Sequence, residues 1–195
     1  MWNEGEIMTA IVDYGAGNLT SVKNAFAVLG VDAVVTRAAD VIRAADRVVF
    51  PGVGAAKSAM ANLRSLGLDA AVREAAASGR PFLGICLGMQ ILFEHSEEDG
   101  GVDLLGILPG KVKRFPDVPG FKVPEIGWNQ VNGKTDYYFV HSYYAEKGPF
   151  TVGTTEYAGI EFTSAVKKGN LVAYQFHPEK SGKAGLNLLK EFLSC

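Results

Sequence analysis

Short apolar runs alternate with stretches of helical periodicity in the first half of the chain. Helices are predicted where apolar side chains recur at three- and four-residue spacing, over 18–29, 40–45, 56–66 and 69–78. Asn18 is expected to cap the first of them. Buried strands are predicted at the apolar runs 7–12, 31–36, 47–50 and 81–83. This alternation indicates a parallel sheet with helices on both faces.

The second half of the chain changes character. Short β-like pieces over 107–131 are interrupted by prolines and glycines, which is typical of edge strands and hairpins. Further elements are predicted as strands at 137–144, 151–157, 164–167 and 171–176, and as a final helix at 183–193. We therefore predict an α/β fold with an open, mostly parallel sheet, antiparallel strands added in the C-terminal half, and a single domain over 1–195.

Composition narrows the class of protein. The 195 residues are 48% hydrophobic and 21% charged, with a formal net charge of −2. The chain is therefore long enough for one substantial core and has no basic excess that would favour nucleic acid or anionic membranes. We expect a cytoplasmic protein, because no run approaches the ~18 apolar residues of a membrane span and the acidic start is unlike a signal peptide. Cys86 and Cys195 are too few for a disulfide framework and lack metal-ligand spacing.

The segment 84–90 contains the main chemical candidate. Cys86 follows a predicted strand and, because 91–94 continue at helical spacing, it should lie where the chain turns sharply into a longer helix. Gly84 and Gly88 complete a G-x-C-x-G pattern, the thiol counterpart of a nucleophile elbow in which small residues avoid Cβ clashes. Free amides and the positive end of the helix dipole favour a thiolate there. Cys86 is therefore a candidate nucleophile, with a buried structural cysteine as the alternative.

Two glycine loops match nucleotide-binding patterns only in part. Gly15 and Gly17 open a strand–helix turn, but Thr20 stands where a dinucleotide fingerprint needs a small residue. Lys57 follows two glycines, but Ala56 occupies the place where a phosphate loop requires glycine. We therefore expect a nucleotide site at neither loop.

Three histidines are available as a base for Cys86. His95 lies nine residues further along the same predicted helix, roughly 13 Å away along its axis, and is expected at the surface. His141 lies within an apolar run, which favours a hydrogen-bonded structural histidine. His177 ends an apolar strand, and active groups of open parallel sheets gather at the carboxyl ends of strands. Glu179 can accept from its second ring nitrogen, fix the tautomer and stabilise the imidazolium, although a chance His-Pro-Glu is the alternative.

Acyl chemistry at Cys86 would also need donors for a developing oxyanion. The elbow supplies the amide of Leu87, and a second amide could come from Gly52, Val53 or Gly54 at the end of a neighbouring strand. Because glycines flank Val53, rotation of a peptide there should cost little. We therefore predict that this loop acts as a switch.

Six segments together resemble one enzyme family. The order Cys, His, Glu, with a glycine-framed elbow and a late His-Pro-Glu, is similar to class I (triad) glutamine amidotransferases, and in detail to the glutaminase subunits of imidazole glycerol phosphate synthase. The resemblance implies the flavodoxin-like fold of that class. The segments that carry it are 13–19, 51–54, 84–90, 127–129, 139–143 and 175–180.

The resemblance implies a role for each matching residue. Cys86 would attack the side-chain amide of glutamine, forming a γ-glutamyl thioester and releasing ammonia. His177 would protonate the leaving group and then activate water, and Glu179 would orient His177. The glutamine-binding positions would be Gln90, Glu98, Ser142 and Tyr143. No cofactor or metal is implied.

The resemblance also implies a partner. It would be a (β/α)8-barrel cyclase, forming a heterodimer, that joins the ammonia to a ribulosyl aminoimidazole nucleotide and releases imidazole glycerol phosphate and an aminoimidazole carboxamide ribotide. Asn18, Tyr138 and Lys180 match positions at the interface, near the ammonia passage. The chain departs from the family at Glu125, where histidine is usual, and residues 1–6 resemble an extension before the usual start.

Three alternatives remain open from the residues. A glutaminase subunit of pyridoxal phosphate synthase would share the Cys-His-Glu set but not the turn at 13–19. A redox-sensing or chaperone-like protein could use the same cysteine elbow but would not need His177 and Glu179. A catalytically silent module could bind a partner only, which an intact triad argues against.

Overall fold

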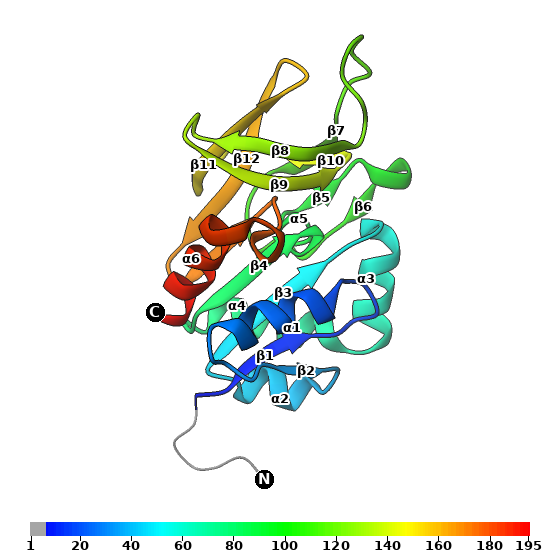
Figure 1. Cartoon of the computed structure of the whole chain (residues 1–195). Coiled ribbons are helices and arrows are strands. Elements are labelled where there is room, and N and C mark those ends of the chain that lie inside the picture. The colour runs from blue at the N-terminus through cyan, green and yellow to red at the C-terminus, as the bar shows by residue number, and fades with distance from the viewer. Residues whose placement is uncertain (1–6) are drawn as a thin grey trace.

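The computed structural model describes residues 7–195, so the predicted extension at 1–6 lies outside the described residues. An eleven-stranded sheet runs through the molecule (Figure 1). Its parallel part contains, in spatial order, β2 (Val34–Thr36), β1 (Thr9–Val12), β3 (Arg47–Gly52), β4 (Phe82–Cys86) and β13 (Leu171–Tyr174). These strands are hydrophobic along nearly their whole length because helices cover both faces.

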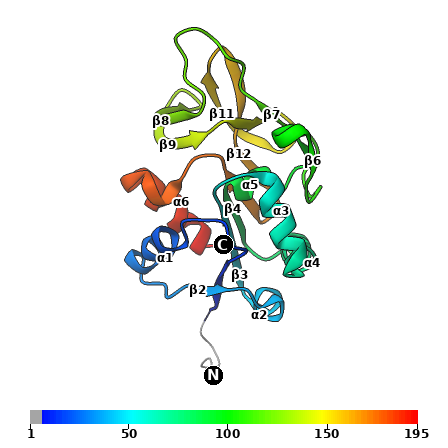
Figure 2. The same ribbon diagram turned by 90° about the vertical axis from the view of Figure 1, so that its right-hand side faces the viewer.

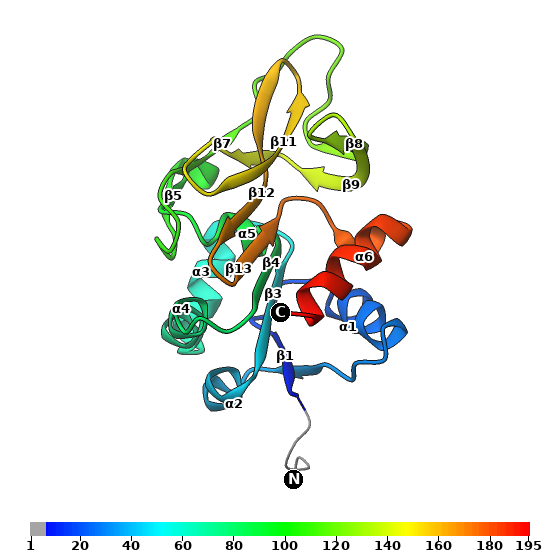
Figure 3. The same cartoon turned by 90° about the vertical axis from the view of Figure 1, so that its left-hand side faces the viewer.

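The C-terminal half adds antiparallel strands, as predicted. The sheet continues from β13 into β12 (Ile160–Lys168), β10 (Tyr143–Ala145), β7 (Lys111–Arg114), β5 (His95–Ser96) and β6 (Val102–Asp103). β11 (Thr151–Tyr157) pairs with β12 outside this path. A separate antiparallel hairpin consists of β8 (Glu125–Val131) and β9 (Thr135–His141). Figure 3 shows this hairpin and β11–β12 together at one end of the molecule.

The helices divide between the two faces of the parallel strands (Figure 2). One face carries α1 (Leu19–Val28) and α6 (Gly182–Leu193), whose residues Phe26, Leu189 and Phe192 pack on β1, β3 and β4. The other face carries α2 (Ala39–Ala44), α3 (Ala56–Ser65) and α4 (Leu68–Ala77). Asn18 caps α1 as predicted, because its Oδ1 accepts from the amide of Ser21 at 3.2 Å.

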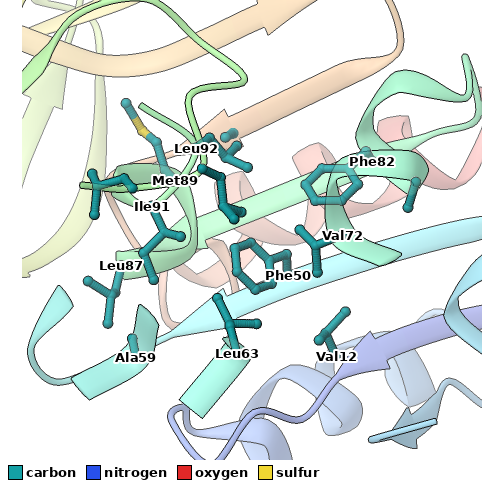
Figure 4. Packing of buried hydrophobic residues seen from close by; sticks show 14 of the residues in the cluster. Val12, Phe50, Ala59, Leu63, Val72, Phe82, Leu87, Met89, Ile91 and Leu92 are labelled. Atoms are coloured by element: carbon teal, nitrogen blue, oxygen red, sulfur yellow. The ribbon is translucent and has the colours of Figure 1, made fainter. Parts of the chain in front are cut away.

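The larger core anchors the segment that follows β4. Phe50 and Phe82 lie in it with Leu63 and Val72, and it includes Leu87 from the short helix α5 (Leu87–Gln90) (Figure 4). A further cluster, separate from the larger core and from the one that α1 and α6 form with the sheet, is aromatic and lies under the β8–β9 hairpin. It contains Phe115, Tyr137, Phe139, Tyr144, Phe162 and Phe176. The end of the sheet where α5 begins is therefore held between two packed clusters.

The prediction of a long helix after Cys86 is wrong. The helix that is present, α5, is a single turn that ends at Gln90. His95 lies in strand β5, and its half-exposed side chain is 3.0 Å from Asp103. The apolar residues 91–93 are buried on all sides rather than along one helical face. Their carbonyl groups accept hydrogen bonds from the amides of 105–108, a second chain segment that replaces the continuing helix.

The strand before His177 is also shorter than predicted. β13 ends at Tyr174, and the chain then leaves the sheet before the 3-10 helix η2 (Pro178–Lys180). The amide of His177 donates to the carbonyl of Tyr138 on β9 at 2.9 Å. The β8–β9 hairpin therefore holds the backbone of His177 in place, because this residue lies beyond the end of β13.

Candidate active site

Cys86 lies at a strained elbow between β4 and α5. Its φ of 54° and ψ of −113° are unusual for a residue with a Cβ, and it is only 6% exposed. The flanking glycines are required by close packing. A Cβ at Gly84 would lie 2.9 Å from Cβ of Ala173, and one at Gly88 would overlap the carbonyl oxygen of Phe50. The elbow predicted from the G-x-C-x-G pattern is present for the predicted steric reason.

The helix dipole contributes less at Cys86 than the sequence predicted. The prediction assumed a long helix, whereas α5 has four residues. What α5 supplies at the elbow is therefore the free amides of one turn.

His177 and Glu179 form a buried pair beside the elbow. His177 Nδ1 lies 2.8 Å from Glu179 Oε1, and both side chains are 2% exposed. A carboxylate can only accept, so Nδ1 carries the proton and Nε2 is the nitrogen left for the reacting groups. Nε2 has no aligned hydrogen-bond partner within residues 7–195 and is fully buried. It therefore keeps a free hydrogen-bonding position.

Cys86 and Glu179 together control the charge of His177. Burial alone would lower the pKa of His177, but Cys86, and then Glu179, oppose this effect and raise it to about 10. The structure thus brings together all three residues of the predicted triad, and their charges favour an imidazolium at His177.

A cavity of about 300 Å³ opens at Cys86. That volume suits a small polar metabolite. Its walls come from the elbow, the loop after β3, the start of η1 (Glu98–Gly100) and the end of β9. It is lined by Val53, Gly54, Cys86, Leu87, Gln90, Glu98, Pro124, Val140, His141, Ser142 and Tyr143.

Three of the candidate oxyanion donors, Leu87, Val53 and Gly54, line this cavity, whereas Gly52 does not. Gly52 is the last residue of β3 and the register partner of Cys86. It is closely packed, because a Cβ there would overlap the hydroxyl of Tyr14. Val53 is 40% exposed, and Gly54 has a φ of +96° with open space around it. Rotation is therefore easier at the Val53–Gly54 peptide than at Gly52.

Tyr14 is an active-site neighbour that the sequence did not reveal. Its ring is fully buried, and within the described residues its hydroxyl has no hydrogen-bond partner. Burial, and then the negative charge of Cys86, raise the pKa of this hydroxyl. The side chain therefore stays neutral beneath the candidate oxyanion strand.

Gln90 is held by two contacts in the wall of the cavity. Its Nε2 donates to the carbonyl of Tyr143 at 2.7 Å and to Oε1 of Gln175 at 2.9 Å. Gln175 is completely buried, and its own Nε2 lies 3.8 Å from the sulfur of Cys86. Gln175 thus connects the predicted amide-binding residue to the nucleophile. Its place in the segment 175–180 was visible in the sequence, but this contact was not.

The other predicted glutamine-binding residues, Glu98, Ser142 and Tyr143, also line the cavity. Some of the polar groups of Glu98 and Tyr143 are already hydrogen-bonded within the protein. The Glu98 carboxylate accepts from the amide of Ala56 at 2.6 Å. Burial, together with the charge of Asp99, raises the pKa of Glu98, although the bond from Ala56 opposes the shift. The carbonyl of Tyr143 accepts from both Gln90 and His141, so its two lone pairs are occupied. Any contact of Tyr143 with a ligand must therefore use another group.

A model of one protein family matches nearly the whole chain. The model is described as glutamine amidotransferase class-I and matches residues 10–194. The chain belongs to the class I glutamine amidotransferase family. It is therefore a glutamine amidotransferase enzyme, as the resemblance implied.

Three curated relatives of this class I amidotransferase carry the name "Imidazole glycerol phosphate synthase subunit HisH". A protein of Moorella thermoacetica is 52% identical, over 94% of this chain and 92% of its own. One of Methanothermobacter thermautotrophicus is 49% identical, over 95% and 98%. One of Pseudomonas putida is 48% identical, over 95% and 96%. These relatives align with this chain over almost their full length.

Solved structures agree with the predicted fold class. One described as "Crystal structure of glutamine amidotransferase" has a TM-score of 0.74 at 22% identity, covering 95% of this chain and 97% of its own. A glutamine amidotransferase of Thermotoga maritima has a TM-score of 0.60 at 18% identity, covering 97% and 85%. At these identities the likeness shows the fold alone.

Two of the three predicted interface residues of this amidotransferase lie together. The Lys180 ammonium is 5.9 Å from the centre of the Tyr138 ring, within reach of a cation–π contact. The same ring meets Trp128 edge to face at 6.2 Å. Asn18 is exposed at the start of α1, and α1 packs beside η2, which contains Lys180.

Proposed function

We propose that the chain hydrolyses glutamine at Cys86 and passes the ammonia to a (β/α)8-barrel cyclase, as the glutaminase subunit of an imidazole glycerol phosphate synthase. The observation that carries the proposal is the buried Cys86 at a strained elbow, with the His177–Glu179 pair beside it and a cavity in front. The relatives named above favour this synthase over pyridoxal phosphate synthase. A cytoplasmic location stays a prediction.

The residues of the site account for both halves of the hydrolysis. The Cys86 thiolate adds to the side-chain carbonyl of glutamine, and the amide of Leu87 with that of Val53 or Gly54 stabilises the oxyanion. His177 gives the proton on Nε2 to the departing nitrogen, so ammonia leaves and a thioester forms. His177 then takes a proton from water, which attacks the thioester, and glutamate leaves as Cys86 is restored.

The remaining wall of the cavity suits the amino acid head group. Glu98 provides a negative charge for the ammonium of glutamine, and the segment at Ser142 and Tyr143 lies beside it in the same wall. Gln90 is placed to hold the side-chain amide next to Cys86. We propose these four residues as the glutamine-binding set.

The proposed partner face lies on the β8–β9 hairpin. Ile126 and Trp128 are 63% and 58% exposed, respectively, although both are large and apolar. On a monomer, exposed apolar side chains grouped with Tyr138 and Lys180 indicate a binding surface. The word "subunit" in the relatives' name implies a partner of this kind. Within residues 7–195, no helix is both long and apolar enough to span a bilayer.

Glutamate release measures this proposal directly. The purified chain would be assayed with glutamine, first alone and then with the cyclase barrel and its nucleotide substrate. We expect weak release alone and a rise of orders of magnitude in the complex. High release that the partner leaves unchanged would keep the chemistry at Cys86 but reassign the protein to another amidotransferase. No release under either condition would favour a binding module.

A further inference from the structure

Two buried ionisable side chains lie at or beside the cavity and have no role in the steps above. Glu125 begins β8 and His141 ends β9, and the two are register partners in the hairpin. Each side chain is 3% exposed, and His141 Nε2 lies 3.0 Å from Glu125 Oε2. Asn129 donates to the other carboxylate oxygen at 2.8 Å. Glu125 is also the position where the family resemblance leads one to expect histidine.

The ring of His141 faces a polar group at each nitrogen. Nδ1 lies 2.7 Å from the carbonyl of Tyr143, which can only accept, so Nδ1 carries a proton. Nε2 faces Glu125 Oε2 across the 3.0 Å contact, but the two atoms are not aligned as a hydrogen bond, and neither has another hydrogen-bond partner within the described residues. The carboxyl is therefore the one polar partner of this nitrogen, through an electrostatic contact.

No other group can replace Glu125 at Nε2. Aromatic rings surround the imidazole, with centroids 5.3 Å away for Phe115, 5.3 Å for Phe162 and 5.7 Å for Phe139. Nε2 is fully buried, and within residues 7–195 it has no hydrogen-bond partner and no ion-pair partner other than Glu125. Removing the carboxyl would therefore leave a buried nitrogen unpaired.

The contacts of the His141 ring with Tyr143 and Glu125 hold the corner between β9 and β10 in place. Its neighbour Val140 places a carbonyl 3.8 Å from the sulfur of Cys86. The carbonyl of Tyr143 that binds His141 also binds Gln90. The corner residues Val140, His141, Ser142 and Tyr143 all line the cavity. The orientation of one ring thus sets several groups that face the substrate.

We propose that Glu125 is a positioning residue for glutamine, acting through His141 on the corner 140–143. The inference rests on the proposed function, because it assumes that glutamine occupies this cavity. Since the corner contacts the substrate throughout the reaction, its displacement weakens substrate and transition state alike, which raises KM more than it lowers kcat.

The test measures KM and kcat for glutamate release by the full chain, alone and with its partner enzyme. Glu125→Ala is expected to raise KM for glutamine about tenfold or more. Glu125→Gln is expected to restore it, because the amide can donate to a neutral His141 and still accept from Asn129. KM does not depend on the amount of active protein, so partial misfolding does not imitate the effect. Asp136→Asn, at an exposed carboxylate of β9, is the matched control.

A double-mutant cycle tests the route through His141. In a His141→Phe background, Glu125→Ala should add no further rise in KM, because the group it acts through is gone. An unchanged KM in Glu125→Ala, or an equal rise in both backgrounds, would overturn the inference. A wild-type chain that releases no glutamate in either condition would instead overturn the proposed function, and the inference with it.

Discussion

Cys86 combines a buried sulfur with a strained backbone, and the strain is unfavourable for folding. A positive φ at a residue with a Cβ costs about 1–3 kcal/mol. The strained residue lies at the cavity, and Cys86 and Glu179 together favour the charged form of His177. The cost is offset by the packing of the glycines on either side, which anchors the elbow between β3 and β13.

The charge of His177 gives a testable pH dependence. Because Cys86 and Glu179 raise its pKa to about 10, the ring should remain protonated through neutral pH and lose its proton only near pH 10. Cys86→Ser and Glu179→Gln each remove a group that favours the imidazolium, while burial remains. Both should move the transition to lower pH, Cys86→Ser further than Glu179→Gln. An NMR titration of the histidine ring protons, assigned with His177→Asn, measures the shift, and an unchanged midpoint in both variants would contradict the pairing.

The sequence revealed residues whose type and local spacing carry the chemistry. Cys86 between glycines and His177 two residues before Glu179 need only their neighbours to be recognised. Tyr14, Gln175 and the environment of Glu125 could not be found that way. Their roles arise where segments far apart in sequence meet, and no local pattern encodes such a contact.

Among the elements, the loop after β3 stays the predicted switch. Gly52 is locked against Tyr14 and α5, whereas Gly54 has open space. The sequence predicted a switch at 52–54 without separating these two positions. The distinction required the packing around each glycine. The helix after Cys86 was also predicted too long, because an apolar run alone does not distinguish a fully buried irregular segment from a helix.

A proline at Val53 tests the loop as a source of an oxyanion donor. Val53→Pro removes the candidate amide, and losing one such donor typically lowers kcat about 10²–10³-fold. The matched control, Val53→Ala, keeps the amide and should retain most of the activity. Alkylation of Cys86 by iodoacetamide should stay unchanged in both, which shows that the elbow is intact. Equal activity of Val53→Pro and Val53→Ala would exclude this amide as a donor.

At the scale of the whole molecule, one surface carries the features of an interface. The β8–β9 hairpin exposes Ile126 and Trp128, and its inner side contributes His141 to the cavity. The parallel core with helices on both faces and the added antiparallel half followed from alternating patterns in the sequence, whereas the order of the core strands did not. The separate hairpin did not, because its pairing and its place over the aromatic cluster depend on contacts that span the C-terminal half.

Substitution of Trp128 tests this surface. Trp128→Asp should weaken binding of the cyclase barrel by about 2 kcal/mol or more, as expected for a buried aromatic anchor. Glutamate release by the chain alone should change little. Val28→Asp alters another exposed apolar residue, at the far end of α1, and should leave binding unchanged. Calorimetric titration measures both, and equal affinities would place the interface elsewhere.

The most direct test of the account is the source of nitrogen used by the assembled enzyme with Cys86→Ala. If Cys86 only generates ammonia for a separate site, glutamine should no longer support synthesis of imidazole glycerol phosphate. Added ammonium salt should support it at close to the wild-type rate, since the cyclase is untouched. Loss of synthesis from both sources would mean that Cys86 has a structural role, and continued synthesis from glutamine would contradict its role as the nucleophile.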